Sequence, residues 1–496
     1  MRSSHHWSLL FVSMSFAGCD GDDTPAPAAS ACRFEVSHEL SSAIPTVGIV
    51  TWSTDLEAVE SVRVEFGPDT SYGSTARVDL ESSEQRAFLL GLKPSREYHF
   101  RVVADNGATS CASEDHSLTT GDIANGLALP SLSTHAAGDV TPGFLLLARY
   151  TNAGPVGGGP VMMPIGTAGA PGGMEFGEAG GPWQEMVAGA GGAPEGAMIV
   201  DPGGDHESWL YVLDADAEPV WWMTAPISEV SRLLMSDDGQ HLFAMSLNVA
   251  GEAPGHLLKI SVDGLDVESI ELPNAHHDFT LTPDGDIVFI QKSADDCDEI
   301  VKRSSDGSFS TIYRVADAFG GDLSGGHSGD RCHTNSIHYN AEDDSFTFSV
   351  LNMNCYVKVS ASGELQWVLG GDFSDFSGDG AEWDREHGHH WLGDDRLLLF
   401  SNGSPADDGS LAFEVELDHD AGVATRVFRY EGGESSAVLG DVQRLPNGNT
   451  LIAYSTAGVI HEVDPAGALL REIRWPLGSA FGYVNHRSSL YAAPPR

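Results

Sequence analysis

The chain has 496 residues and carries 26 lysines and arginines against 72 aspartates and glutamates, so its formal net charge is −46. This charge excludes a surface that neutralises a phosphate backbone, and we expect no nucleic-acid partner. Hydrophobic residues make up 41% of the chain, which is enough for a sizeable core in two or three domains.

The first residues have the pattern of an export signal. An apolar run from Trp7 to Ala17 follows a basic residue and is too short to span a bilayer. It ends in SFAGC, which resembles a bacterial lipobox with Cys19 as the lipidated residue. We therefore expect a lipoprotein signal peptide over residues 1–19, with an ordinary signal peptide as the alternative, and a Pro/Ala-rich tether over 20–32. The predicted location is the bacterial cell envelope, on its periplasmic face or the cell surface, with the lipid anchor as the membrane contact.

Export also permits disulfides. Cys32 and Cys111 bracket the first domain and are expected to join its ends. The remaining three cysteines are Cys297, Cys332 and Cys355. Their number is odd, and their spacing does not decide which two form a bond.

Residues 33–120 show short alternating strands that end in LKPSREYHFRVV, which begins at Leu92. A Leu-x-Pro turn that leads into a tyrosine-bearing strand resembles a fibronectin type III domain, so we expect a β-sandwich here. Its expected role is that of a spacer or adhesion module. Residues 153–197 follow, in which 15 of 45 residues are glycine without a three-residue period. We expect this segment to be a flexible insertion in the first repeat of the next domain.

The rest of the chain is repetitive. A hairpin pattern recurs six times at intervals of 43 to 56 residues, starting at Tyr211, Lys259, Lys302, Lys358, Glu414 and Glu462. A second pattern, with a polar turn before an apolar strand, precedes five of these by 22 to 28 residues and starts at Ser231, His277, His333, His387 and Gly440. Two phases of one period predict an all-β fold, in which a six-bladed β-propeller spans 125–496 and residues after Tyr483 complete a blade.

The second pattern brings three histidines to one repeat position: His277, His333 and His387. Equivalent positions on the inner strands of a propeller face one axial channel, so the three imidazoles are expected to converge. The alternative is that each histidine is a hydrogen-bonded structural residue. His276, His389 and His390 lie next to or near these three residues. A shift of the strand register by one residue would therefore change which rings point inward.

At these residues the chain resembles the bacterial arylsulfate sulfotransferases, six-bladed propellers preceded by a small β-sandwich. The sequence HTNS from His333 is similar to the family's His-x-Asn-Ser, and His387 stands where the family has the histidine of its Gln-His motif. FSNG from Phe400 is similar to Phe-Asp-Asn-Gly, and HHD from His276 looks like the first histidine element. The terminal HRSSLY from His486 resembles the ending found in relatives.

The resemblance implies that a sulfuryl group moves from an aryl sulfate to a phenol without a cofactor. His387 would attack the sulfur and form a sulfohistidine intermediate. His277 and His333, with Asn335, would hydrogen-bond the sulfuryl oxygens or handle the phenol proton. The further candidates for substrate binding are His276 and His389.

Two positions depart from the family pattern. The family's Ser-x-Arg on the returning strand is Ser349-Val350-Leu351 here, and loss of one such donor typically lowers the rate about 100- to 1000-fold. The glutamine before the catalytic histidine is Glu386, a carboxylate expected to repel an anionic substrate. Two alternatives stay open. The three histidines, with Asp278, could bind zinc, copper or iron, or the propeller could bind ligands without catalysis, as Leu351 suggests.

Overall fold

The computed structural model describes residues 32–78, 80, 85–151, 208–248, 254–323, 330–403 and 409–491. The predicted signal peptide with Cys19, nearly all of the tether and the glycine-rich segment 153–197 lie outside these residues. Within the described part of the chain, no helix has the length and apolar character needed to cross a membrane. Strands make up nearly all of the regular structure, and the prediction of an all-β chain is confirmed.

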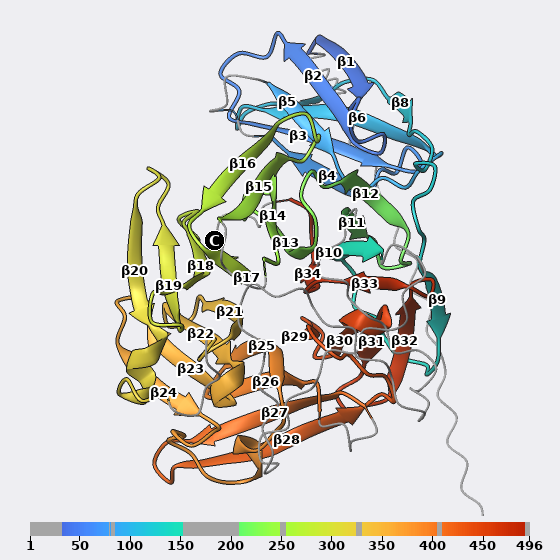
Figure 1. Ribbon diagram of the computed structural model, residues 1–496. Coiled ribbons are helices and arrows are strands. Elements are labelled where there is room, and N and C mark those ends of the chain that lie inside the picture. Colours follow the sequence, from blue (N-terminus) through green and yellow to red (C-terminus); the bar gives the residue numbers. More distant parts are fainter. Residues whose placement is uncertain are drawn as a thin grey trace, which may run out of the picture.

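Two antiparallel sheets form a small sandwich at the start of the described chain (Figure 1). The first sheet consists of β1 (Phe34–Leu40), β2 (Gly48–Thr54) and β5 (Arg86–Leu89). The second consists of β3 (Ser61–Gly67), β4 (Ser74–Arg77), β6 (Glu97–Asp105), β7 (Ser110–Ala112) and β8 (His116–Thr119). Inward-facing residues such as Val50, Val64 and Phe100 share one core. The predicted disulfide between Cys32 and Cys111 is present and joins the start of the domain to β7.

Among the described residues, six further antiparallel sheets are arranged in a ring, as Figure 1 shows, and form blades of a β-propeller. One blade consists of β13 (Val230–Met235), β14 (His241–Ser246), β15 (Gly255–Ser261) and β16 (Val267–Leu272). The following blade consists of β17 (Ala275–Leu281), β18 (Ile287–Lys292), β19 (Asp298–Arg303) and β20 (Phe309–Arg314). The next two are β21 (Thr334–Asn340), β22 (Ser345–Val350), β23 (Cys355–Ser360), β24 (Leu365–Leu369), and β25 (Glu386–Gly393), β26 (Arg396–Ser401), β27 (Leu411–Asp418), β28 (Val423–Glu431). The first strands of neighbouring blades contact one another, so these strands are innermost.

The two ends of the propeller chain close the ring. The fifth blade in this order is β29 (Asp441–Arg444), β30 (Thr450–Tyr454), β31 (Val459–Val463) and β32 (Leu469–Arg474), to which β9 (Ser131–Thr134) adds an outer strand. The last is β10 (Phe144–Thr151), β11 (Ser208–Leu213) and β12 (Pro219–Thr224), with β33 (Ser479–Phe481) and β34 (Asn485–Arg487) paired to β10. Short 3-10 helices are η1 (Val315–Phe319), η2 (Leu351–Met353), η3 (Asp379–Ala381) and η4 (Ser455–Ala457). A strand after Tyr483 thus completes a blade, as the sequence predicts.

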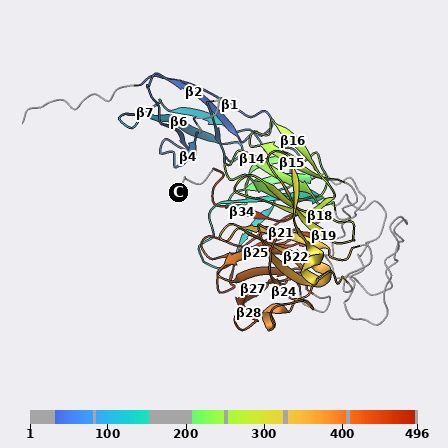
Figure 2. The same cartoon turned by 90° about the vertical axis from the view of Figure 1, so that its left-hand side faces the viewer.

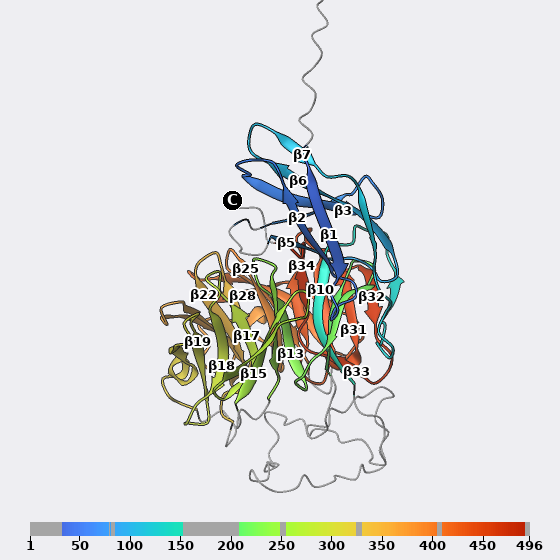
Figure 3. The same cartoon turned by 90° about the horizontal axis from the view of Figure 1, so that it is seen from above.

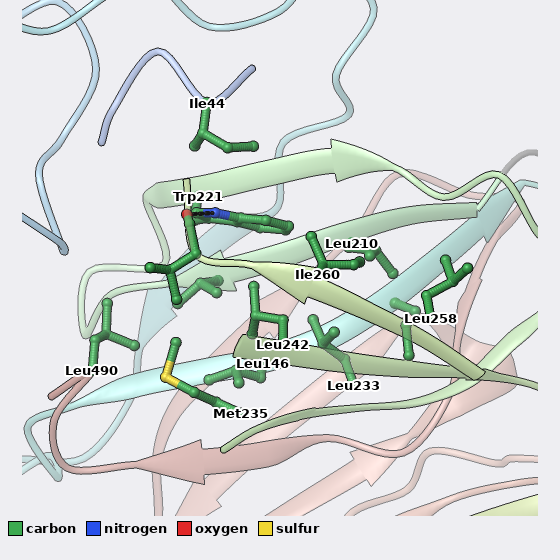
Figure 4. Packing of buried hydrophobic residues seen from close by; sticks show 14 of the residues in the cluster. Ile44, Leu146, Leu210, Trp221, Leu233, Met235, Leu242, Leu258, Ile260 and Leu490 are labelled. Carbon is green, nitrogen blue, oxygen red and sulfur yellow. Dashed lines mark hydrogen bonds between the residues drawn. The ribbon is translucent and has the colours of Figure 1, made fainter. Parts of the chain in front are cut away.

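The sandwich packs against the rim of the propeller, away from its centre (Figures 2 and 3). Ile44 of the sandwich and Leu490 near the C-terminus belong to the same buried cluster as Trp221 of β12, and Figure 4 shows these side chains together. Lys93 of the sandwich pairs with Asp214 at 2.9 Å in the turn between β11 and β12. The two domains therefore share a core, and the candidate catalytic residues all lie in the propeller.

Candidate active site

Four blades begin with an equivalent main-chain hydrogen bond. The main-chain N–H near the end of the second strand donates to the carbonyl of the residue at the start of the first strand, at 2.7 to 3.1 Å. We call the acceptors the start positions, which are Glu229, Asn274, His333 and Arg385, with φ between 46° and 56°. We call the donors the return positions, which are Leu247, Lys292, Leu351 and Asn402. Residues with side chains rarely adopt positive φ, and such backbones are enriched at functional sites.

A third equivalent position lies inside the ring. His277, Asn335 and His387 are each the first of two residues in a break of the strand register, two residues before regular pairing resumes. We expected His333 at this position, and the structure places it two residues earlier. The sequence patterns misalign these blades because β21 is longer beyond its break than β17 and the following turns differ in length.

His277 and His333 nevertheless meet, because their ring centroids lie 4.8 Å apart. His276 joins the group, with its Nδ1 2.7 Å from Nδ1 of His277 and its Nε2 3.1 Å from Oδ1 of Asp298. The buried carboxyl of Asp298 has a lowered pKa, since the charge and hydrogen bond of His276 and the charge of Lys292 outweigh the effect of burial. An ionised Asp298 accepts from Nε2 of His276. When Nδ1 of His277 donates to Nδ1 of His276, Nε2 of His277 keeps a free lone pair.

Asp330 holds the other side of this group. Its carboxylate accepts a hydrogen bond from Nδ1 of His333 and pairs with the ammonium group of Lys292. Lys292 also lies 3.7 Å from Asp298, so one cation bridges the two carboxylates that orient the histidines. Burial raises the pKa of Asp330, but the hydrogen bond from His333 and the nearby charges lower it more. Nε2 of His333 is thus the ring nitrogen that can reach a ligand.

A disulfide between Cys297 and Cys332 fastens these elements together. Cys297 immediately precedes Asp298, and Cys332 immediately precedes His333. The sequence left this pairing open, and the structure leaves Cys355 as a buried free thiol. The bond ties the blade that carries His276 to the blade that carries His333.

His387 is buried and is held by Asn402 of its own blade. Its side chain is 5% exposed, and its Nδ1 hydrogen-bonds to Oδ1 of Asn402. The Asn402 amide nitrogen donates to the carbonyls of Ser436 at 2.8 Å and Leu439 at 2.9 Å, which fixes the direction of the amide. Because Oδ1 can only accept, Nδ1 of His387 carries the proton and Nε2 has the lone pair.

Charge also favours this form of His387. Burial, followed by the charge of His333, lowers the pKa of His387 to about 3, and the positive charge of Arg385 contributes in the same direction. The imidazole is therefore neutral at ordinary pH. A neutral ring with a free Nε2 is the nucleophilic form of histidine.

Asn335 and Glu386 lie beside His387. The Asn335 amide nitrogen donates to the Glu386 carbonyl at 3.0 Å, and its Oδ1 has no hydrogen-bond partner among the described residues. The Glu386 side chain is completely buried and accepts from the indole of Trp383 at 3.1 Å. Burial raises the pKa of Glu386 to about 8, so it is mostly protonated at neutral pH. The expected repulsion of an anionic substrate therefore does not arise, because the group is neutral there.

His389 takes a different part. Its Nδ1 lies 2.9 Å from the Ser336 hydroxyl and its Nε2 lies 2.9 Å from the Thr347 hydroxyl, so both ring nitrogens have protein partners. The ring also packs against Tyr356, with centroids 5.0 Å apart. These contacts assign His389 to the packing of β25 against the preceding blade and not to substrate binding.

A buried ionic cluster lies directly beyond the histidines. Arg232 of β13 donates from Nη2 to Asp278 at 2.9 Å, and its Nη1 lies 3.5 Å from Asp441 of β29. Its guanidinium also stacks 4.4 Å from the ring centroid of Tyr483, whose hydroxyl donates to the Asn335 carbonyl at 2.7 Å. Asp278 directly follows His277, so the cluster ties the first strands of several blades together beneath the site.

The metal alternative finds little support in this arrangement. Asp278, its proposed fourth ligand, is bound by Arg232. Among the residues that the structure describes, one group of three potential ligands has its atoms within 4.8 Å of one another: Glu434, His461 and Glu472. That group contains none of the three histidines, and Arg474 pairs with both of its carboxylates.

Several site residues were not identified from the sequence: Asp298, Asp330, Lys292, Arg385 and Asn402. Asn402 belonged to the FSNG segment that carried the resemblance, so its motif was a usable signal. The others come together only through contacts between blades, which no local pattern reveals.

A sequence model of the arylsulfotransferase (ASST) family matches residues 190–479, more than half of the chain. A search of curated proteins gave no match. Similar solved structures include a streptogramin B lyase, with 15% identity, 57% of this chain and 90% of that chain covered, and a TM-score of 0.37. Another is an inactive virginiamycin B lyase from Staphylococcus aureus with quinupristin, with 13% identity, 56% and 83% covered, and a TM-score of 0.35. A periplasmic gluconolactonase from Pseudomonas aeruginosa has 12% identity, 86% and 99% covered, and a TM-score of 0.38. We draw no functional conclusion from scores this low. The family match, by contrast, spans the blades that carry all three histidines, and the chain belongs to the arylsulfotransferase family.

Proposed function

We propose that the protein transfers a sulfuryl group from an aryl sulfate to a phenol through a sulfohistidine at His387. The observation that carries this proposal is the hydrogen bond between His387 and Asn402, which supports a neutral imidazole with its Nε2 lone pair free. Membership of the arylsulfotransferase family supplies the substrate class. The rings of His277 and His333, which are in contact, supply two further imidazoles to the site.

In the first half-reaction, Nε2 of His387 attacks the sulfur of the aryl sulfate. The bond between nitrogen and sulfur forms while the bond between sulfur and the aryl oxygen breaks, and the phenolate leaves with the electron pair. The proton stays on Nδ1 of His387, hydrogen-bonded to Oδ1 of Asn402, so the sulfated ring is an imidazolium and remains a good leaving group. With a proton on both ring nitrogens, His333 donates from Nδ1 to Asp330 and can donate from Nε2 to the sulfuryl oxygens.

In the second half-reaction, an acceptor phenol gives its proton to Nε2 of His277 and attacks the sulfur. The sulfur–nitrogen bond then breaks, and His387 returns to its neutral form. Burial lowers the pKa of His277 well below its usual value, which keeps this base unprotonated before the phenol arrives.

The proposal includes an envelope location. The basic and apolar start of the chain and the SFAGC sequence favour export and lipid attachment at Cys19, with the propeller outside the cytoplasm. The disulfides Cys32–Cys111 and Cys297–Cys332 agree with an oxidising compartment. Labelling with a radioactive fatty acid, compared between wild type and Cys19→Ala, tests this part separately.

The test of the transfer is mass spectrometry of the purified protein after incubation with 4-nitrophenyl sulfate without acceptor. We expect a sulfuryl adduct on His387, release of 4-nitrophenol, and loss of both in His387→Ala. The matched control is His390→Ala, because burial also lowers the pKa of His390 to about 3, while its Nδ1 accepts from the Arg444 main chain instead. An adduct that persists in His387→Ala would disprove the assignment. No adduct and no release with several donors would favour the non-catalytic binding protein that Leu351 suggests.

A further inference from the structure

The candidate site needs a cation that can meet the substrate. An aryl sulfate is an anion, and charge on its sulfuryl group must be stabilised during transfer. The return position at which the family pattern has an arginine holds Leu351 here, and leucine cannot donate a hydrogen bond. Nearby cations therefore have to be examined for one that is not already neutralised.

Two of these cations are engaged. Lys292 occupies the return position of the preceding blade, but it pairs with Asp330 and lies 3.7 Å from Asp298. Arg232 is clamped by Asp278 and Asp441 beneath the histidines. Neither can pair with a ligand without releasing a carboxylate in a buried setting, which is costly.

Arg385 differs from both. It occupies the start position of the blade that carries His387, equivalent to His333, whose ring lies within the histidine group. The guanidinium is half-buried and donates from Nη2 to the Ala437 carbonyl at 2.9 Å, and within the described ranges no ion pair joins it to a carboxylate. The main-chain carbonyl of Arg385 accepts from the N–H of Asn402 at 2.8 Å, and the side chain of Asn402 holds His387, so Arg385 lies beside the nucleophile.

We propose that Arg385 binds the sulfuryl oxygens of the aryl sulfate and replaces the arginine that is missing at Leu351. This inference rests on the sulfuryl transfer proposed above. A guanidinium presents several N–H donors in one plane, so the contact with Ala437 leaves donors for two sulfuryl oxygens. The left-handed backbone of Arg385, with φ of 56°, sets the direction in which its side chain leaves the strand.

The experiment measures binding and transfer separately in Arg385→Gln and Arg385→Lys. Benzenesulfonate is the binding probe, because its sulfur is bonded to carbon and the sulfonate group cannot be transferred. Isothermal titration calorimetry measures its affinity. In Arg385→Gln we expect at least a tenfold weaker affinity and kcat/KM for 4-nitrophenyl sulfate lowered about 100-fold or more. Arg385→Lys should recover part of the affinity, and Arg385→Gln combined with Leu351→Arg should recover part of the transfer.

Arg426→Gln is the matched control. Arg426 is another half-buried arginine of the same blade that donates to main-chain carbonyls, those of Asp379 at 3.0 Å and Glu382 at 2.7 Å. Arg426→Gln should keep the wild-type affinity for benzenesulfonate and the wild-type kcat/KM for 4-nitrophenyl sulfate. Thermal unfolding of every variant checks that it is folded.

The outcomes separate this inference from the proposed function. If the wild type transfers the sulfuryl group and Arg385→Gln transfers it equally well, the role of Arg385 is wrong and the proposed transfer stands. Benzenesulfonate binding that depends on Arg385, in a protein that transfers nothing, supports the anion site and disproves the transfer. If wild type and Arg385→Gln bind benzenesulfonate equally, the inference is wrong.

Discussion

The Asn402 amide oxygen accepts a hydrogen bond from Nδ1 of His387, while the amide nitrogen donates to two main-chain carbonyls. This relationship determines which ring nitrogen of His387 is available for reaction. Ser436 and Leu439, which supply the carbonyls, lie in the connection to the next blade, so the orientation of the nucleophile depends on the packing of two blades.

Replacing Asn402 tests this positioning. Asn402→Ala should lower kcat for 4-nitrophenyl sulfate roughly 100-fold, at the low end of what a group that controls a proton contributes, and change KM little. The reason is that the ring can then rotate or take the tautomer with its proton on Nε2. The control is Asn449→Ala, which removes a buried asparagine that donates to Asp139 and Glu462 in another blade. An equal loss of kcat in both variants would indicate general destabilisation.

His277 offers a way to separate the two half-reactions. In His277→Gln, phenol release from the donor without acceptor should stay within a few-fold of wild type, while turnover with a phenolic acceptor falls roughly 100-fold. The sulfuryl adduct should then accumulate, because its removal needs the base and its formation does not. Rapid-quench mass spectrometry measures the adduct, with His390→Gln as the control. If adduct formation itself slows as much as turnover, His277 acts in the first step instead.

Local sequence patterns were sufficient to predict most of the blade hairpins. Alternating residues around polar turns mark two-stranded units wherever they occur, and the repeat of such units implies a ring. The resemblance singled out His277, His333 and His387, and the structure brings the rings of His277 and His333 into contact, while their role in catalysis stays a prediction.

The exact positions within the blades could not be predicted. Asn335 occupies the break in strand register at which we expected His333, because the sequence pattern of this blade does not mark where the break lies. The neutral state of Glu386 depends on burial between blades, and the ion pairs of Lys292 join residues from separate segments. Such features follow from tertiary packing, so they became visible only in the folded chain.

The disulfide between Cys297 and Cys332 should matter for activity as well as stability. In the double variant Cys297→Ala, Cys332→Ala we expect kcat/KM to fall about tenfold or more, because Asp298 and His333 are adjacent to the two cysteines and must keep sub-ångström positions. The control removes Cys32 and Cys111, which join parts of the sandwich remote from the site. Each pair of changes should cost about 2–4 kcal/mol of stability, so both should lower Tm. Only loss of the propeller disulfide should alter kinetics at a temperature where both variants are folded.

Glu386 predicts a pH dependence of stability. Burial between the blades raises its pKa in the folded protein from an ordinary value of 4.5 to about 8, so the folded state keeps a proton that the unfolded chain has lost between these values. The stability of the folded state is therefore undiminished by this group below about pH 4.5 and declines as the pH rises toward 8. One pKa unit corresponds to about 1.4 kcal/mol, so the accumulated effect is several degrees in Tm.

Glu386→Gln should remove this decline, because glutamine can still accept from Trp383 and carries no charge at any pH. The Tm difference between Glu386→Gln and wild type should grow in favour of the variant from pH 5 to pH 9, measured by differential scanning calorimetry. Activity at pH 7 should change little, since Glu386 is already mostly neutral there. Glu382→Gln, an exposed change four residues earlier, is the control and should give a constant difference. A constant difference for Glu386→Gln as well would mean that Glu386 is not held protonated by burial.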